Sequence, residues 1–310
     1  MATKHIIAAK QFNTASINKI FKLADKFKSS KKTSKILDGK IMSTLFYEPS
    51  TRTRLSFESA MQRLGGRVIS TESAAEFSSA AKGETLEDTI RVVNCFSDII
   101  VLRHFSEGAS QTAAEYSKVP IINAGDGKGE HPTQAMLDLY TIISKFKKIN
   151  LTISMVGDLE NGRTIHSLSY LLSLYKGVKI IYVSPKALSI PKQLREFLKS
   201  KNVSFEETES LKEPLKRSDV IYQTRIQKER FASSNGSSSE SEYLRYFGKY
   251  IIDKNSLKLI RKNAIIMHPL PRINEITPEV DDDPRAFYFQ EVQNGLYVRM
   301  ALLLYVFDKA

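Results

Sequence analysis

Residues 50–54 read Ser-Thr-Arg-Thr-Arg, which places three hydroxyl groups and two guanidinium groups in one short stretch. The apolar run 41–46 before it predicts a buried strand, and apolar residues at helical spacing over 55–64 predict a helix. Ser50 or Thr51 suits the N-cap of that helix. A helix N-terminus offers free backbone N–H groups and the positive end of the helix dipole. The stretch therefore predicts a phosphate-binding corner.

The same stretch, taken alone, also fits a well-capped helix with solvated arginines. Capping by itself favours Ser and Thr at a helix start, so their presence does not require a ligand. The rest of the chain has to decide between the two interpretations.

Length and composition indicate a soluble protein of two domains. The chain has 310 residues, of which 42% are hydrophobic and 26% charged. No apolar run approaches the roughly 18–20 residues that span a bilayer, and the first ten residues lack the apolar core of a secretion signal. Cys95 is the only cysteine, which excludes an intrachain disulfide and a multi-cysteine metal site. We expect a cytoplasmic protein with no membrane association.

The formal net charge of +12 fits two kinds of partner, nucleic acids and small anions. The lysines are spread along the whole chain, which is typical of solvated helix faces rather than of one binding stripe. No zinc-finger spacing and no aromatic RNA-binding motif occurs. We expect no nucleic-acid partner.

Strand-like and helix-like segments alternate along the chain. The expected strands are 41–46, 67–70, 98–102 and 120–123 in the first half, and 151–158, 179–183, 219–224 and 264–267 in the second. Amphipathic helices are expected between them, and alternation of this kind predicts parallel sheets. The fold class is α/β, with two doubly wound domains, each a parallel β-sheet flanked by helices. The predicted domains are 1–133 plus 293–310, and 134–292.

Polar clusters follow six of these strands. They lie at 48–54, 103–104, 124–134, 157–163, 224–227 and 268–272. In open parallel sheets, ligands bind at the carboxyl ends of the strands. The agreement across six elements predicts an active site in a cleft between the two domains.

Neither a metal nor a nucleotide cofactor is expected. His131, His268 and Asp126 lack metal-ligand spacing. The glycines between 125 and 129 lack the phosphate-loop pattern, and the segment 157–162 lacks the dinucleotide-binding pattern. Each polar residue also has a structural interpretation: His131 before a proline can be a core or capping group, and arginines can be surface ion-pair partners.

Residues 46–54 resemble the carbamoyl-phosphate signature of the aspartate and ornithine carbamoyltransferases, and Glu48-Pro49 resembles the aspartate branch. The resemblance extends from about residue 41 to residue 304, with six motifs in family order. It implies that the first domain binds carbamoyl phosphate and the second binds aspartate. It also implies transfer of the carbamoyl group to the α-amine of L-aspartate, giving N-carbamoyl-L-aspartate and phosphate, an early step of pyrimidine biosynthesis.

The resemblance assigns roles residue by residue. The carbamoyl phosphate set is Ser50, Thr51, Arg52, Thr53, Ser78, Lys82, Arg103, His131, Gln134, Leu270 and Pro271. The set expected to act in catalysis is Arg52, Thr53, Lys82, Arg103 and His131. The aspartate set is Lys82, Arg163, Arg225 and Gln227. Glu48 and Arg230 are expected to take part in domain closure, with Glu48 pairing with Arg163 and Arg230.

Two alternatives belong beside this interpretation. Ornithine carbamoyltransferases carry a cysteine in a His-Cys-Leu-Pro segment, whereas this chain has His268-Pro269-Leu270-Pro271. Arginines at 163 and 225 also suit a dicarboxylate better than a cationic amino acid. The second alternative is a non-catalytic scaffold or a basic nucleic-acid-binding paralogue, although the signature residues that such a protein could lose are present here.

The family resemblance also implies an assembly. Ser78 and Lys82 resemble a loop that reaches into the active site of a neighbouring chain, which implies a homotrimer with shared sites. Some members of the family join zinc-bearing regulatory chains, and this sequence does not decide whether such a partner exists. The Ser-rich segment 232–241 is longer than the family pattern and is expected to be a loop.

Overall fold

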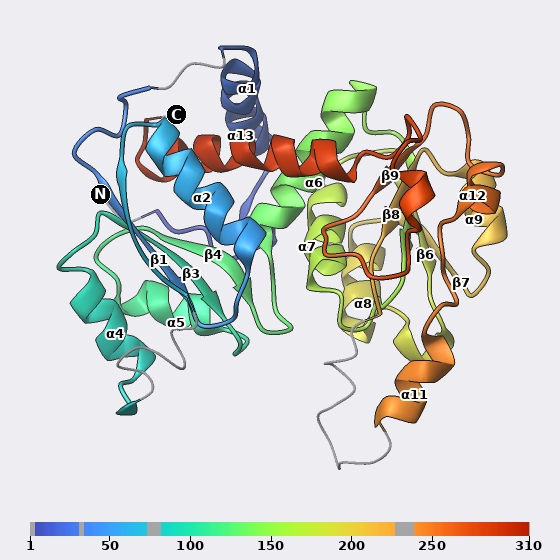
Figure 1. The fold of residues 1–310 in the computed structure, drawn as a ribbon, viewed down its shortest axis with the longest axis horizontal. Helices are drawn as coiled ribbons and strands as arrows, with labels where there is room; N and C mark the ends of the chain where they lie inside the picture. Colours follow the sequence, from blue (N-terminus) through green and yellow to red (C-terminus); the bar gives the residue numbers. More distant parts are fainter. Residues whose placement is uncertain (1–3, 31–33, 73–81, 227–238, 310) are drawn as a thin grey trace. The chain divides into compact units, whose positions relative to one another are not determined.

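The computed structural model describes residues 4–30, 34–72, 82–226 and 239–309 (Figure 1). The chain forms two compact units. Unit 1 comprises Met1–Tyr140 and Gln293–Ala310, and unit 2 comprises Thr141–Val292. Each unit contains one sheet whose paired strands are all parallel. This confirms the predicted fold class of two α/β units with parallel sheets flanked by helices.

The sheet of unit 1 has the strand order β2-β1-β3-β4. Its strands are β1 (Ile41–Phe46), β2 (Arg67–Glu72), β3 (Ile99–His104) and β4 (Ile121–Asp126). Every residue of β3 and β4 is buried, as expected for parallel strands covered on both faces. The strand β2 is the exposed edge.

Helices cover both faces of this sheet (Figure 1). The helix α2 (Thr51–Arg63) lies on one face, and α4 (Leu86–Val93) and α5 (Ala109–Tyr116) lie on the other. Leu45, Ile90 and Ile121 belong to the apolar cluster that joins β1, β3 and β4 to α4 and α5. A short 3-10 helix, η1 (Ala9–Gln11), precedes α1.

Three longer helices complete unit 1. They are α1 (Thr14–Ser30), α6 (Pro132–Phe146) and α13 (Tyr288–Val306), and the boundary between the units lies within α6 and within α13. The hydroxyl of Tyr140 donates to Asp25 of α1 at 2.7 Å, and Lys28 donates to Asn294 of α13 at 3.2 Å. These contacts tie α1 to the other two helices.

The sheet of unit 2 has the strand order β7-β6-β5-β8-β9. Its strands are β5 (Thr152–Val156), β6 (Lys179–Val183), β7 (Ser204–Thr208), β8 (Val220–Gln223) and β9 (Ile265–Met267). Its helices are α7 (Arg163–Leu172), α8 (Lys192–Ser200), α9 (Lys212–Arg217), α11 (Ser239–Tyr246) and α12 (Lys254–Leu257), with 3-10 turns η3 (Lys186–Leu188) and η4 (Pro278–Val280). Figure 1 shows α7 and α8 on one face of the sheet and α9 and α12 on the other.

Two parts of unit 2 differ from the sequence prediction. The strand β7 and the helix α9 were not expected. The sequence signal of β7 is weak because it is a half-exposed edge strand with Phe205 as its only large apolar residue. The segment 232–241 was expected to be a loop, yet residues 239–241 already belong to α11. Residues 232–238 lie outside the described part of the chain.

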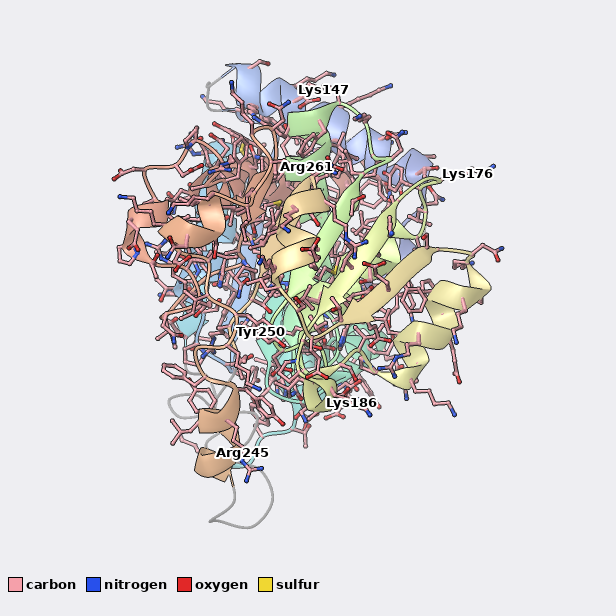
Figure 2. All side chains as sticks on the ribbon, turned by 90° about the vertical axis from the view of Figure 1, so that its right-hand side faces the viewer. Lys147, Lys176, Lys186, Arg245, Tyr250 and Arg261 are labelled. Carbon is pink, nitrogen blue, oxygen red and sulfur yellow. The ribbon has the colours of Figure 1, made fainter. Side chains whose placement is uncertain are left out.

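Basic side chains of unit 2 come from many separate elements (Figure 2). Lys147, Lys176, Lys186, Arg245 and Arg261 are all exposed. Lys147 follows α6, and Lys176 precedes β6. Lys186 begins η3, Arg245 lies in α11, and Arg261 follows α12. The spread agrees with the distribution of charge along the sequence.

No helix within the described ranges combines the length and the apolar character needed to cross a membrane.

Candidate functional site

The predicted phosphate corner joins β1 to α2. Ser50, one of the two residues predicted for the N-cap, takes that position, and its side chain makes no capping hydrogen bond. Thr51 and Arg52 are exposed, and Thr53 is buried. The first turn of α2 therefore directs backbone N–H groups and hydroxyl groups to the end of β1, where an anion can replace the missing cap.

Arg103 is held rigidly near the end of the neighbouring strand β3. Its side chain is nearly buried; Nη1 donates to the carbonyl oxygen of Ala124 at 3.1 Å, and Nη2 lies 3.1 Å from Oε2 of Glu48. Glu48 lies in the turn that leads from β1 to α2. The pair brings together two residues that the sequence had assigned to different tasks, phosphate binding and domain closure.

The loop after β4 is built around Asp126. Its Oδ1 accepts from the backbone N–H of Glu130 at 2.9 Å and its Oδ2 from that of Gly108 at 3.2 Å. Gly127 has a φ of +47°, and a Cβ there would lie 2.6 Å from the carbonyl oxygen of Phe105. The loop therefore needs glycine at 127, and it fixes where the next helix begins.

His131 and Gln134 lie at the start of α6. The carbonyl oxygen of His131 accepts from the backbone N–H of Gln134 and of Ala135, both at 3.1 Å, so His131 takes the N-cap position. Both side chains are almost fully buried. Nε2 of Gln134 donates to Oδ1 of Asp138 one turn further along.

His104, beside Arg103, is neutral at physiological pH. Burial lowers its pKa, and the charge of Asp126 acts in the opposite direction. Nδ1 of His104 accepts from the backbone N–H of Ser106 at 3.0 Å, and its ring stacks on Phe105. The cationic group at the end of β3 is therefore Arg103.

These residues occupy the topological switch point of the first sheet. From β1 the chain proceeds to β2 on one side and later to β3 on the other. Ligands of doubly wound sheets bind at the carboxyl ends of strands at such a point. Glu48, Arg103 and the start of α2 all lie there.

The second sheet has its switch point between β5 and β8. Gly157 follows β5 with a φ of +125°, and a Cβ there would lie 2.3 Å from the carbonyl oxygen of Thr224. Thr224 donates through both its backbone N–H and its hydroxyl to the carbonyl oxygen of Val156. Arg163 is the first residue of α7, and Arg225 directly follows Thr224. Arg225 therefore lies just past the carboxyl end of β8, and Arg163 begins the helix that follows the adjacent strand β5.

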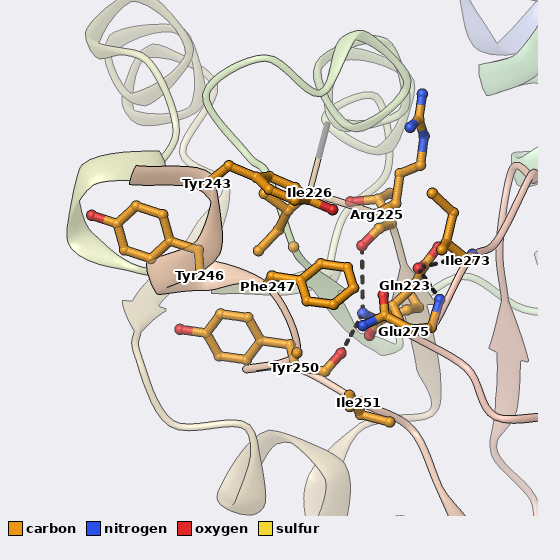
Figure 3. Close-up of a pocket in the computed structure, with 14 residues that line it drawn as sticks. Gln223, Arg225, Ile226, Tyr243, Tyr246, Phe247, Tyr250, Ile251, Ile273 and Glu275 are labelled. Atoms are coloured by element: carbon orange, nitrogen blue, oxygen red, sulfur yellow. Dashed lines mark hydrogen bonds between the residues drawn. The ribbon is translucent and has the colours of Figure 1, made fainter. Parts of the chain in front are cut away.

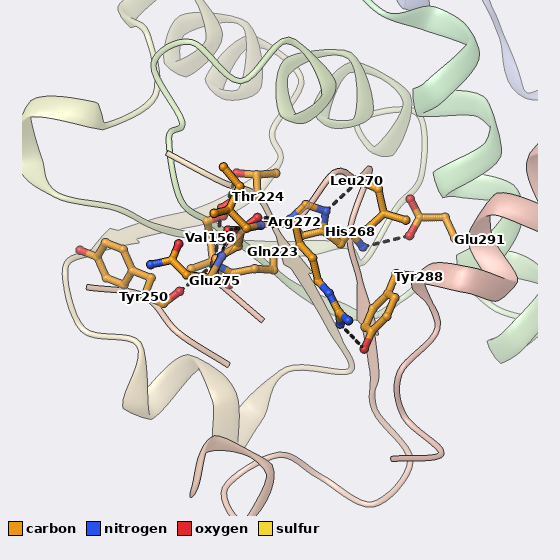
Figure 4. A network of polar contacts seen from close by, with 12 residues as sticks. Val156, Gln223, Thr224, Tyr250, His268, Leu270, Arg272, Glu275, Tyr288 and Glu291 are labelled. Atoms are coloured by element: carbon orange, nitrogen blue, oxygen red, sulfur yellow. Dashed lines mark hydrogen bonds and ion pairs between the residues drawn. The ribbon is translucent and has the colours of Figure 1, made fainter. Parts of the chain in front are cut away.

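The segment after β9 is held by a buried histidine (Figure 4). Nε2 of His268 lies 2.8 Å from Oε1 of Glu275, and Nδ1 of His268 accepts from the backbone N–H of Leu270 at 2.7 Å. Leu270 has a φ of +54°, which is costly for a branched residue. The position of the Leu270 and Pro271 carbonyl groups thus depends on His268.

Glu275 is a buried carboxylate with several donors. Its Oε2 accepts from the backbone N–H groups of Ile273 and Asn274, both at 3.1 Å. Burial opposes ionisation, but the hydrogen bond from His268 and the backbone N–H donors outweigh it, so the pKa of Glu275 lies below its usual value. The carboxylate is therefore ionised at neutral pH.

A pocket that opens to solvent adjoins Arg225 (Figure 3). Tyr246, Phe247 and Tyr250 supply aromatic walls, while the guanidinium of Arg225 points away from these rings. Burial raises the pKa of Tyr250 to about 12, so its hydroxyl is neutral. The rings separate the apolar side of this region from the polar end of β8.

Some predicted residues cannot be placed. Ser78, Gln227 and Arg230 lie outside the described residues, and Lys82 is exposed just after one of the gaps. Within the described ranges, no three His, Cys, Asp or Glu side chains are grouped so as to hold a metal ion.

Comparison with known proteins gives matches over both units. Residues 4–144 match the aspartate/ornithine carbamoyltransferase, carbamoyl-P binding domain, and residues 149–306 match the Asp/Orn binding domain. The chain belongs to the aspartate/ornithine carbamoyltransferase family. This confirms the family that the motifs indicated.

Within this carbamoyltransferase family, three of the similar proteins are named as aspartate carbamoyltransferases or aspartate transcarbamoylases. The chloroplastic aspartate carbamoyltransferase of Arabidopsis thaliana is 54% identical, over 96% of this chain and 76% of that protein. The catalytic subunit of M. jannaschii aspartate transcarbamoylase is 50% identical with a TM-score of 0.89, over 98% of both chains. The Trypanosoma cruzi aspartate transcarbamoylase in complex with carbamoyl phosphate and aspartate is 40% identical with a TM-score of 0.89, over 97% of this chain and 96% of that one.

Sequence reasoning missed three partners in this carbamoyltransferase. The ion pair of Glu48 with Arg103 joins residues 55 positions apart, so no local pattern reveals it. The contact of His268 with Glu275 likewise leaves no local pattern, because it depends on the path of the turn between them. Asp138 was detectable, since it lies four residues after Gln134 on a predicted helix face.

Proposed function

We propose that this chain is an aspartate carbamoyltransferase, which transfers the carbamoyl group from carbamoyl phosphate to the α-amine of L-aspartate. The products are N-carbamoyl-L-aspartate and phosphate, at an early step of pyrimidine biosynthesis. The observation that carries the proposal is Arg103, which Glu48 and Ala124 hold at the switch point beside the α2 N-terminus. The aspartate-type relatives support the choice of acceptor.

Carbamoyl phosphate would bind at the start of α2. Ser50, Thr51, Arg52 and Thr53 supply hydroxyl, guanidinium and backbone donors for the phosphate, and Ser78 and Lys82 add to them from a neighbouring chain. Attack of the amine places negative charge on the carbonyl oxygen of the carbamoyl group. Arg103, His131 and Thr53 would stabilise this charge as preorganised donors.

The carbamoyl amide needs acceptors rather than donors. Gln134 supplies its side-chain oxygen, and Leu270 and Pro271 supply backbone carbonyl groups. The departing phosphate takes the proton of the attacking amine, so the reaction needs no covalent intermediate on the protein.

Aspartate would bind through its two carboxylates. Arg163, which begins the helix after β5, and Arg225, which follows the adjacent strand β8, each suit one carboxylate, and Gln227 and Lys82 assist. A cationic side chain such as that of ornithine would meet two guanidinium groups there. This charge arrangement favours aspartate over ornithine as the acceptor.

The test offers the purified chain carbamoyl phosphate with L-aspartate or with L-ornithine. We expect N-carbamoyl-aspartate, with kcat/KM for aspartate at least about a thousandfold above that for ornithine, because a misplaced charge leaves buried polar groups unpaired. Citrulline formation would instead favour ornithine carbamoyltransferase. Silence with both acceptors, together with no heat of carbamoyl phosphate binding, would favour a scaffold protein.

Glu48 would exchange partners when the substrates bind. In the structure it pairs with Arg103, and we propose that it turns to Arg163 and Arg230 when the site closes. We expect Glu48→Gln to raise the KM for aspartate about tenfold, because its proposed closure partner Arg163 belongs to the aspartate set, while the Kd of carbamoyl phosphate changes less than about threefold. Equal losses in both constants, measured by calorimetry and steady-state kinetics, would contradict the closure role.

The shared site implies a homotrimer. A mixture of Lys82→Ala and Arg103→Ala chains, each inactive alone, should regain activity after subunit exchange, because some sites then receive both native residues. If the mixture stays inactive after subunit exchange, Lys82 does not act in the site of a neighbouring chain. The mass of the native assembly, measured by light scattering in cell extract fractions, shows whether a regulatory chain accompanies the trimer.

A cytoplasmic location is part of the same proposal. The Arabidopsis relative is named as chloroplastic, so family membership alone does not set the compartment. Imaging of the tagged full chain in its own cells would decide it, and signal confined to an organelle would contradict it.

A further inference from the structure

A buried carboxylate lies directly behind Gln134. Asp138 follows one helical turn later on α6, and its Oδ1 accepts from Nε2 of Gln134 at 2.8 Å. Asp138 has no exposed surface, and Gln134 is 8% exposed. An ionised carboxylate at such a depth needs a compensating positive charge.

A positive charge that acts on Asp138 is that of Arg299 on α13, which is also buried. Burial lowers the pKa of Arg299 to about 10, while the negative charge of Asp138 acts in the opposite direction. Arg299 is therefore protonated at neutral pH. Gly295 makes room for it, because a Cβ at 295 would lie 3.0 Å from Nη1 of Arg299.

Arg299 is in turn anchored on α2. Its Nη1 donates to Oγ of Ser56 at 2.8 Å, and its guanidinium lies 5.2 Å from the ring centre of Phe57. Ser56 and Phe57 come one turn after Thr53 on the helix that begins the phosphate corner. The charges of Asp138 and Arg299 thus lie behind both helix starts that carry the carbamoyl phosphate set.

Stability alone does not account for these charges. Burying two charges usually adds little net stability compared with well-packed apolar residues, because removing them from water is costly. A buried carboxylate does fix the orientation of a polar group that donates to it. One group that donates to Asp138 is the amide of Gln134.

We propose that Asp138 is a positioning residue that fixes the amide of Gln134 for the carbamoyl group. An amide side chain can present either its oxygen or its nitrogen. Because Nε2 is committed to Asp138, the oxygen is the atom that would accept an N–H of the carbamoyl amide. The inference rests on the proposed function of the α2 and α6 corner.

The test is a double-mutant cycle on the full chain with Asp138→Asn, Gln134→Ala and the two combined. Asparagine keeps the shape but can present either an oxygen or an N–H group to Gln134, so the amide loses its single orientation. We expect Asp138→Asn to lower kcat/KM for carbamoyl phosphate about tenfold, the usual size for a hydrogen bond to a charged group. In the Gln134→Ala background the same change should cost less than about twofold.

A structural role would give a different pattern. If Asp138→Asn costs the same factor with and without Gln134, or costs nothing in either background, the proposal is wrong. Met136→Leu, a volume-conserving change at another buried position of α6, is the packing control and should leave kcat/KM within about twofold.

Two further arms keep the result interpretable. If Asp138→Asn alone fails to fold, the cycle is run in the Arg299→Gln background, which removes both buried charges together. If the wild-type chain does not carbamoylate aspartate, the proposed function fails, and the cycle is measured as the Kd of carbamoyl phosphate by calorimetry. Non-additive losses in Kd would still support the role of Asp138, and additive losses would overturn it.

Discussion

Arg103→Ala is expected to lower kcat by about a thousandfold or more while the chain stays folded. One preorganised donor to a developing oxyanion typically contributes a factor of about 10²–10³. Arg103 would also neutralise charge on the leaving phosphate, which adds to this factor. Steady-state kinetics at saturating L-aspartate, with the melting temperature as a measure of folding, check the prediction.

Arg103→Lys separates charge from geometry. Lysine keeps the positive charge but cannot donate at once to Ala124 and to Glu48 from a planar fork. We expect kcat of Arg103→Lys to fall about a hundredfold, so that it lies between the kcat of the wild type and that of the alanine variant. Equal activity of lysine and arginine would show that only the charge matters.

Arg54→Ala is the matched control, because it removes one arginine from the same corner. Arg54 pairs with Glu72 of β2 at 2.7 Å and with Glu58 of its own helix, α2, at 3.6 Å. Such partly exposed ion pairs contribute up to about 1 kcal/mol to the free energy of unfolding. Because a loss of that size would slow the reaction less than about fivefold even if it were felt entirely in the transition state, we expect kcat to fall by less than that factor. If Arg54→Ala is as harmful as Arg103→Ala, or if Arg103→Ala retains a tenth of the activity, the assignment of Arg103 is wrong.

The sequence predicted the two sheets because each strand is a short apolar run between helix signals. The strand 41–46 was predicted with the bounds that β1 has, since Pro49 and the hydroxyl-rich turn mark its end. In contrast, β7 was missed because its sequence, Ser-Phe-Glu-Glu-Thr, pairs on one side only and stays half exposed. Edge strands need less apolar surface, so their pattern is weak.

The site was predictable to the level of strand ends. Carboxyl ends of parallel strands gather at one edge, so the sequence pattern alone places Arg103, Arg163 and Arg225 beside their strands. The partners of these residues could not be placed in the same way. Glu48 meets Arg103 only because β1 and β3 are adjacent, and sheet order is a property of the folded chain.

The absence of a side-chain cap at Ser50 shows a further limit of local rules. Capping preferences predicted Ser50 or Thr51 at the N-cap of α2, and Ser50 takes that position without a capping hydrogen bond from its side chain. A residue that suits a cap also suits a phosphate, because both tasks need an oxygen or a hydroxyl near free N–H groups. Residue preference alone therefore cannot distinguish a structural cap from a ligand site.

Glu275→Leu is expected to destabilise unit 2 and to abolish activity. The change leaves His268 and two backbone N–H groups without their acceptor in a buried turn, and the loss of one partner from such a network costs roughly 3–5 kcal/mol. For a unit of this size the melting temperature should fall by about 10 °C. Leu270 would lose its support through His268, so the backbone turn that carries the proposed carbamoyl-binding carbonyl group would shift.

Glu275→Gln tests the contribution of the charge through its dependence on pH. The pKa of Glu275 is lower in the folded chain than in the unfolded chain, where it is about 4.3. Its stabilisation is therefore fully present above the unfolded value and is lost as the pH falls through the folded value. The gap in melting temperature between wild type and Glu275→Gln should be largest near neutral pH and should shrink below about pH 4.3.

Glu279→Gln provides the control for this prediction, because Glu279 lies four residues further along and is exposed. The free energy of unfolding of the Glu279→Gln variant should differ from that of the wild type by less than about 0.5 kcal/mol at every pH. If the gap for Glu275→Gln is the same at about pH 7 and about pH 3.5, on either side of the unfolded value, its origin is packing and not the ionised carboxylate. If Glu275→Leu keeps both the melting temperature and kcat of the wild type, the His268 network does not support the Leu270 turn. The backbone carbonyl group of Leu270 must then be held by other contacts.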